Sequence, residues 1–182
     1  MMINNYDPYE KPLHKLYKRF CPGPISFVLK LKRNSCISKN VTNNNKTIAV
    51  RFPSHKLTRN LLKVLKYPLA APSANLSKQI SPVSKSDVVE EFGKKIKFVL
   101  DGGQSKIGVE STIVSLIGKP KILRLGGIER KSIEKFFINR NKTKYKKKKI
   151  VVPGQGKVHY SPGVPIRLNV KHPKNNEAYI II

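Results

Sequence analysis

The most informative stretch of this sequence reads Pro68-Leu-Ala-Ala-Pro-Ser-Ala-Asn-Leu-Ser-Lys-Gln-Ile-Ser-Pro82. It places small residues, hydroxyls and one amide between prolines. Prolines fix φ and remove a backbone donor, and alanines let another backbone or a ligand come close. We interpret the stretch as a close-approach site, although the same residues are also the ordinary composition of a polar loop.

Four further motifs surround this stretch. They are Phe20-Cys-Pro-Gly-Pro24, Leu100-Asp-Gly-Gly103, Gly108-Val-Glu-Ser-Thr-Ile-Val114 and Ile122-Leu-Arg-Leu-Gly126. In this order, over roughly Leu16 to Phe136, the series resembles the YrdC-type threonylcarbamoyl-AMP synthases. The piece from Pro153 to Pro162 resembles the linker that follows the core domain in the longer members of that family.

The composition indicates one ordinary domain and a strongly basic protein. The 182 residues hold 37 Lys and Arg against 10 Asp and Glu, a net charge of +27. Such a balance favours nucleic acid or an anionic surface as partner, but a lysine-rich chain without Trp is also what an AT-rich genome would encode. Two cysteines make no disulfide framework, and no apolar run is long enough to span a bilayer, so we expect a cytoplasmic protein without membrane contact.

Hydrophobic periodicity predicts both helices and strands. Helices are expected from Leu13 to Phe20, over 57–65 with a buried leucine stripe, over 84–92 with Gly93 as its C-cap, and over 132–139. Strands are expected over 25–32, 47–52, 96–100, 111–117 and 121–125, and residues 34–46 are expected to be a turn-rich connection. The pattern predicts an α+β fold or a twisted open α/β sheet, and the resemblance implies a mostly antiparallel sheet flanked by helices.

We divide the chain by composition and by the resemblance into four parts. These are a lead-in (1–15), a partial YrdC-like domain (16–140), a linker with six lysines between Lys142 and Lys149 (141–163), and the start of a missing C-terminal domain (164–182). Family members carry a further segment, with a Lys-x-Arg motif, before the point where this resemblance starts. We therefore expect a domain incomplete at its N-terminus, weak or inactive by itself, which a separately encoded N-terminal segment would complete.

The resemblance also implies a reaction and a set of site residues. The family joins L-threonine, bicarbonate and ATP, carried with Mg²⁺, into threonylcarbamoyl-AMP for tRNA modification. No residue is assigned to proton transfer or to metal binding. The implied ATP-binding residues are Arg51, Ser73, Ser81, Arg124 and Tyr160; those for threonine are His55, Ala71 and Ser111; and Asn75 shapes the loop.

Each assignment has a simpler alternative, since strand arginines are usually exposed and Ser or His near turns usually cap backbone. Two other functions also stay open. A basic chain could be a module that binds tRNA or double-stranded RNA without catalysis, or it could be a non-functional remnant.

Overall fold

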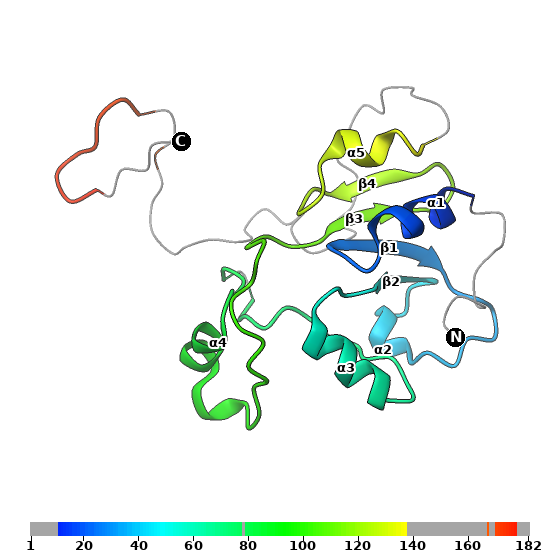
Figure 1. The fold of residues 1–182 in the computed structure, drawn as a ribbon, viewed down its shortest axis with the longest axis horizontal. Coiled ribbons are helices and arrows are strands. Elements are labelled where there is room, and N and C mark those ends of the chain that lie inside the picture. Colours follow the sequence, from blue (N-terminus) through cyan, green and yellow to red (C-terminus); the bar gives the residue numbers. More distant parts are fainter. Residues whose placement is uncertain (1–10, 78, 138–166, 168–169, 178–182) are drawn as a thin grey trace.

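A computed structural model describes residues 11–77, 79–137, 167 and 170–177 of the chain (Figure 1). In this part of the chain, no helix is long and apolar enough to cross a bilayer. The elements in chain order are α1 (Lys11–Phe20), β1 (Ile25–Lys30), α2 (Lys39–Thr42), β2 (Thr47–Arg51), α3 (Lys56–Val64), α4 (Lys85–Phe92), a 3₁₀ turn (Gly93–Lys95), β3 (Thr112–Ser115), β4 (Lys121–Arg124) and α5 (Arg130–Glu134).

The four strands form one mixed sheet in the order β2-β1-β3-β4. The pairs β1–β2 and β3–β4 are antiparallel, and the central pair β1–β3 is parallel. A parallel pair needs a long crossover, and here residues 31–111 provide it. The observed mixed α/β fold, with a mostly antiparallel sheet flanked by helices, confirms the expected class.

Side-chain alternation along β1 sets the two faces of the sheet. Ile25, Phe27 and Leu29 are fully or almost fully buried and point to one face. Ser26 and Val28 point to the other, because successive side chains of a strand alternate. The first face carries the main hydrophobic core, and the second carries only a small cluster of Val28, Ile113 and Leu123.

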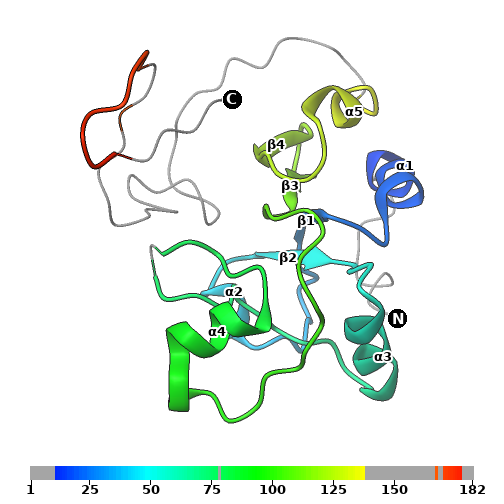
Figure 2. The same ribbon diagram turned by 60° about the vertical axis from the view of Figure 1, so that its left-hand side comes forward.

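Helices α1 and α5 cover the first face, and they lie on the same side of the sheet in Figure 2. Leu16 of α1 and Ile133 of α5 are both fully buried in the main core. The rings of Phe20, at the end of α1, and Phe136, just after α5, meet edge to face at 5.8 Å between centroids. The predicted amphipathic helix over 13–20 is therefore confirmed.

The Pro22-Gly23-Pro24 turn fastens the start of β1 to both of its neighbours. The Gly23 amide donates to Phe52 O at 2.8 Å, and the Thr112 amide donates to Pro24 O at 2.9 Å. A Cβ at Gly23 would lie 2.3 Å from Phe20 O, so only glycine fits. The turn thus aligns the ends of β2, β1 and β3 before any ligand is present.

Several expectations from the sequence need correction. Residues 96–100 form no strand, residues 34–46 contain the short helix α2, and α5 is shorter than predicted, with Asn139 outside the described residues. The leucine stripe of α3 is not buried, since no residue of that helix is. An amphipathic pattern predicts a helix correctly, but burial also needs a surface to pack against.

Removing the Leu16 side chain tests whether α1 is part of the core. Leu16→Ala should lower the free energy of unfolding by about 2–5 kcal/mol, because it removes transfer free energy and leaves a cavity. Leu100→Ala is the matched control, since Leu100 is 62% exposed and should change stability by less than about 0.5 kcal/mol. Urea unfolding followed by circular dichroism measures both, and an equal effect of the two substitutions would contradict this packing.

Helix α4 begins with a capping box. Ser84 Oγ accepts from the Asp87 amide at 3.3 Å, and Asp87 Oδ2 accepts from the amides of Ser84 and Val83 at 3.1 and 2.8 Å. Hydrogen bonding to the Ser84 side chain, then to the Val83 amide, lowers the pKa of Asp87. A lowered pKa in the folded state stabilises the fold above the ordinary Asp pKa, and this contribution is lost as the pH falls through that range.

Asp87→Asn should therefore lower the melting temperature at pH 7, and its difference from wild type should shrink below about pH 4, where the carboxylate of wild type becomes protonated. Glu90→Gln, on the same helix, is the control and should leave the melting temperature at pH 7 unchanged. A difference between Asp87→Asn and wild type that stayed constant with pH would show that the charge of Asp87 has no role.

Candidate functional site

Two arginines meet on the second face of the sheet. Arg51 is the last residue of β2 and pairs in register with Ser26 of β1, while Arg124 is the last residue of β4 and pairs with Ile113 of β3. Ser26 and Ile113 are themselves partners across the parallel pair. The four strands therefore bring Arg51 and Arg124 to the same face, with Ser26 and Ile113 between them.

Buried hydroxyl groups lie beside the arginines. Ser26 Oγ and Ser111 Oγ are 2.8 Å apart, and both residues are buried. Arg124 Nε and Nη2 donate to Ser111 O at 3.2 and 3.0 Å, and Nη2 also reaches Ser111 Oγ at 3.4 Å. This forked contact fixes the plane of the guanidinium group, because both donors point to one carbonyl.

The electrostatics of this face favour an anion. Partial burial lowers the pKa of Arg51, and the positive charge of Arg124 lowers it further. Arg51 still stays protonated at neutral pH. Two like charges close together at a partly buried site repel one another, and a bound anion would reverse the sign of that interaction.

A hydrogen bond attaches the Pro68–Pro82 loop to this face. Ser81 Oγ donates to Glu110 Oε1 at 2.5 Å, and Glu110 immediately precedes Ser111. The Ser105 amide donates to Val83 O at 2.7 Å, a second link between the same two segments. The predicted ATP residue Ser81 is thus brought next to the predicted threonine residue Ser111.

The rest of the loop is open. Asn75 Nδ2 donates to Leu76 O at 2.9 Å and to Gln79 O at 3.0 Å, so this amide closes the turn over residues 75–79. Ala71 and Ser73 lie on its exposed surface. No hydrogen bond joins either residue to the two arginines, and their roles stay predictions.

His55 is the N-cap of α3. Its Nδ1 accepts from the Thr58 amide at 3.4 Å, and its Nε2 lies 3.0 Å from Gly102 O. The tautomer with hydrogen on Nε2 satisfies both contacts, since it accepts at one nitrogen and donates at the other. His55 therefore fastens the Asp101-Gly-Gly103 turn to α3.

Two shallow cavities open on either side of Asp101. One, of about 330 Å³, is lined by His55, Lys56, Leu57, Asn60, Asp101 and Gly102. The other, of about 420 Å³, is lined by Ser84, Lys85, Ser86, Val89, Asp101, Gly103 and Gln104. Of the predicted site residues, His55 lines the first of these cavities, and neither cavity is lined by Arg51 or Arg124.

The sequence reasoning missed two residues of this face. Ser26 and Glu110 contact Ser111 and Ser81 directly; Glu110 lies inside the 108–114 motif, and Ser26 lies in the expected strand 25–32. Alternation along β1 could have identified Ser26, since a serine between Ile25 and Phe27 must face away from the core. Tyr160 lies outside the described residues. Among those that are described, no three His, Cys, Asp or Glu side chains gather as a metal site.

Comparisons with known proteins agree with this fold. The Sua5/YciO/YrdC family model, described as telomere recombination, matches residues 2–126. The threonylcarbamoyl-AMP synthase of Pyrococcus abyssi is 38% identical over an alignment that covers 83% of this chain and 45% of the synthase. The threonylcarbamoyl-AMP synthase of Bacillus subtilis is 36% identical over 88% of this chain and 47% of the synthase. The chain thus spans about half the length of these relatives.

Solved structures give the same result. The crystal structure of P. abyssi Sua5 complexed with L-threonine matches with a TM-score of 0.67 and 39% identity, over 72% of this chain and 38% of that one. Escherichia coli YciO matches with a TM-score of 0.61 at 22% identity, which shows the fold alone. The fold and site therefore define a YrdC-like domain. The chain belongs to the Sua5/YciO/YrdC family.

A substitution at Gly126 tests how far the face of the sheet that carries Arg51 and Arg124, called the arginine face below, depends on backbone packing. A Cβ there would lie 2.2 Å from Glu110 O and 2.7 Å from Ser111 C, so Gly126→Ala must displace both residues and should destabilise the fold by about 1–3 kcal/mol. Gly127→Ala is the control: its Cβ would meet only side-chain atoms of Pro24 and Ile107, at 3.1–3.3 Å. Thermal unfolding of the two variants should rank Gly126→Ala as clearly the less stable, and the reverse order would contradict the geometry.

Proposed function

We propose that this chain binds ATP and L-threonine on the arginine face and takes part in making threonylcarbamoyl-AMP, the intermediate for threonylcarbamoyladenosine in tRNA. One observation carries the proposal: strand register places Arg51 and Arg124 on the same face of the sheet, close enough for the charge of Arg124 to lower the pKa of Arg51, and the buried hydroxyls of Ser26 and Ser111 lie beside them. Fixed cations and hydroxyl donors on a preformed surface are what phosphate recognition requires.

The chemistry of this reaction suits such a surface. The amine of threonine combines with bicarbonate to give a carbamate and water, and a carbamate oxygen then attacks the α-phosphorus of ATP. Pyrophosphate leaves with the electrons of the broken P–O bond. This step needs positioning and charge neutralisation more than proton transfer, and Arg51 and Arg124 would supply both.

The other residues receive roles by their position. Ser81 and Ser73 would bond the nucleotide from the loop that Asn75 shapes, and Ser111 would border threonine together with Ala71. His55 would act through its hold on the turn at Gly102, and Tyr160 would close over the nucleotide. Mg²⁺ would bind together with ATP, because the phosphates commonly supply much of its coordination. Glu110 is the carboxylate beside this face.

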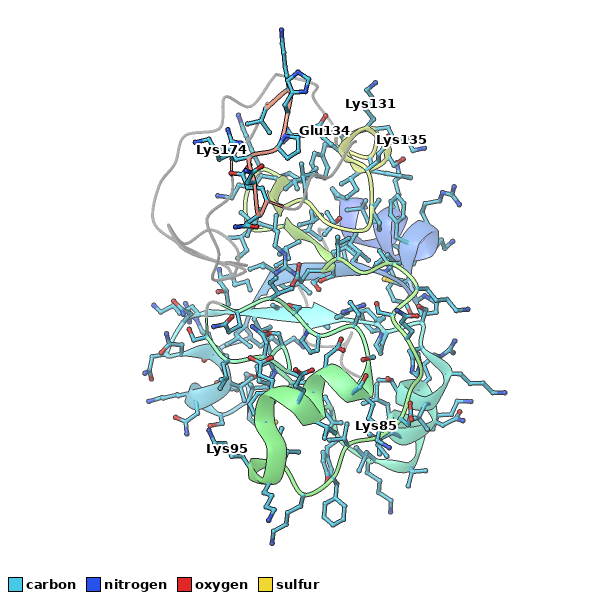
Figure 3. The ribbon with its side chains drawn as sticks, turned by 90° about the vertical axis from the view of Figure 1, so that its left-hand side faces the viewer. Lys85, Lys95, Lys131, Glu134, Lys135 and Lys174 are labelled. Carbon is cyan, nitrogen blue, oxygen red and sulfur yellow. The ribbon has the colours of Figure 1, made fainter. Side chains whose placement is uncertain are left out.

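Binding to tRNA is a second candidate that the net charge of +27 supports. The labelled lysines of the domain in Figure 3 lie at two ends of it, with Lys85 and Lys95 at the start of α4 and in the turn after it, and Lys131 and Lys135 in and just after α5. Charge spread in this way favours weak, salt-dependent attraction of RNA over a single docking face. We therefore place RNA binding second to nucleotide binding.

The proposal includes a location and a partner. Cys21 and Cys36 are free thiols, and burial raises the pKa of Cys21 to about 11, which keeps it protonated. Free cysteines support a reducing compartment such as the cytoplasm. The proposed small-molecule partners are ATP, L-threonine and bicarbonate.

Replacing Arg51 separates a ligand-binding role from a structural one. Arg51→Met keeps most of the alkyl chain and removes the charge that Arg124 repels, so stability should be unchanged or slightly higher. The affinity for ATP with Mg²⁺ and L-threonine should fall at least about tenfold, since a charged hydrogen bond contributes about 1.5–3 kcal/mol.

Titration calorimetry and thermal unfolding of the same samples measure the two effects. Arg59→Met, at an exposed arginine of α3, is the matched control and should leave the affinity unchanged. Saturable binding that Arg51→Met did not weaken would reject the arginine face as the site. A folded chain that binds neither ligand would reject activity of this chain by itself.

A further inference from the structure

Two buried serines meet on the arginine face. Ser26 lies in β1, the strand between β2 and β3, and Ser111 lies just before β3. They are 85 positions apart in the sequence, 8% and 6% exposed, and their Oγ atoms are 2.8 Å apart. Burying a hydroxyl costs free energy unless its hydrogen bonds are made, so the partners of these two groups show what they can still bind.

The two hydroxyls hold one proton more than their protein partners accept. Each serine hydroxyl has one proton to donate and two lone pairs that can accept. Arg124 Nη2 donates to Ser111 Oγ at 3.4 Å, and a guanidinium has no acceptor to offer in return. Among the described residues, Ser26 Oγ bonds only Ser111 Oγ, so one of the two hydroxyl protons is used between them. Whichever serine donates, the other keeps a proton for which the described residues provide no acceptor.

The surroundings decide which serine keeps this proton. Ser26 pairs in register with Arg51, and opposite side chains of paired strands lie close together. An unused O–H on Ser26 would therefore lie beside the Arg51 side chain, whose guanidinium only donates. Ser111 instead follows Glu110, whose carboxylate accepts from Ser81 of the Pro68–Pro82 loop. When Ser26 donates and Ser111 keeps its proton, both lone pairs of Ser111 are used and the unused proton lies next to the loop.

We propose that Ser26 is a positioning residue for ligand binding. Its hydroxyl donates to Ser111 Oγ, and this bond turns the Ser111 proton toward an anionic oxygen of the ligand. Hydrogen bonds in such a chain polarise one another, so the bond from Ser26 also strengthens the one that Ser111 donates. Ser26 acts through Ser111 and does not touch the ligand. The inference deepens the proposed function and rests on it.

This arrangement selects an acceptor. Arg51, Arg124 and the outward proton of Ser111 are all donors, so they recognise oxygen atoms that carry negative charge and disfavour an ammonium group. A carboxylate of L-threonine and a phosphate of ATP share this chemistry. The carboxylate is the oxygen that we expect at Ser111, because Ser111 is the residue expected to border threonine.

Two variants of similar shape test the proposal on the full chain. Ser26→Thr and Ser26→Val add a similar volume to β1 and both suit a strand, but only the threonine variant keeps the hydroxyl. Titration calorimetry with L-threonine, and separately with ATP and Mg²⁺, measures their affinities. Ser26→Thr should bind L-threonine within about twofold of wild type, and Ser26→Val about three- to tenfold more weakly, the range that one neutral hydrogen bond contributes.

Two alanine variants separate positioning from packing. Ser26→Ala adds no volume and should weaken binding as Ser26→Val does. Ser115→Ala is the matched control, since Ser115 is also a buried strand serine and its Oγ accepts from the Ile117 amide at 3.4 Å. Ser115→Ala should lower the melting temperature and leave the affinity for both ligands unchanged.

The outcomes distinguish the ligand and the two proposals. Weaker binding of L-threonine identifies its carboxylate as the partner of Ser111, and weaker binding of ATP alone identifies a phosphate oxygen. Equal affinities of Ser26→Thr and Ser26→Val, or wild-type affinity in Ser26→Ala, would overturn the role of Ser26 and leave the proposed function in place. A folded wild type that binds neither ligand would reject the proposed function, and the role of Ser26 with it.

Discussion

The structure depends on the alternation of side chains along β1. This strand lies at the centre of the sheet, and its odd-numbered residues from Ile25 to Leu29 build the core under α1 and α5. Ser26 and Val28 must then point the other way. Because β2 and β3 pair with β1 in register, Arg51 and Ile113 follow the same alternation. One strand thus separates the face that carries the main core from the face that carries Arg51, Ser26 and Arg124, with only a small apolar cluster.

Hydrogen bonds between separate segments, more than a deep cavity, organise the arginine face. Arg124 bonds the backbone of Ser111, Ser111 bonds Ser26, and Ser81 bonds Glu110. These residues come from separate parts of the sequence, and each is held by a different strand or loop. Such a surface is preformed on its sheet side and adjustable on its loop side, a combination suited to a ligand that must enter and leave.

The sequence predicted the elements that pack within the chain. Helix α1 and the four observed strands were correctly expected, since their partners are all present. Two errors concern burial and pairing: α3 forms as a helix but has no fully buried residue, and residues 96–100 have a strand pattern but form no strand. Hydrophobic periodicity indicates which side chains of a segment could be buried. Whether they are buried depends on the rest of the molecule.

The sequence predicted some residues of the candidate site and missed others. The resemblance selected Arg51, Arg124, Ser81 and Ser111, and the structure brings these four to one region through strand register and one hydrogen bond. It could not select Ser26 or Glu110, because their importance comes from contacts across the fold and not from their motifs. Roles for Ala71, Ser73 and Tyr160 still rest on the resemblance alone.

The link between Ser81 and Glu110 has a consequence for how the site is held together. It joins residues 29 positions apart, and closing a flexible loop of that length costs about 3 kcal/mol of chain entropy. A single hydrogen bond to a carboxylate contributes about as much or less. This single bond therefore does not hold the two segments together alone: the bond from the Ser105 amide to Val83 O and the capped helix α4 also limit the freedom of the intervening chain.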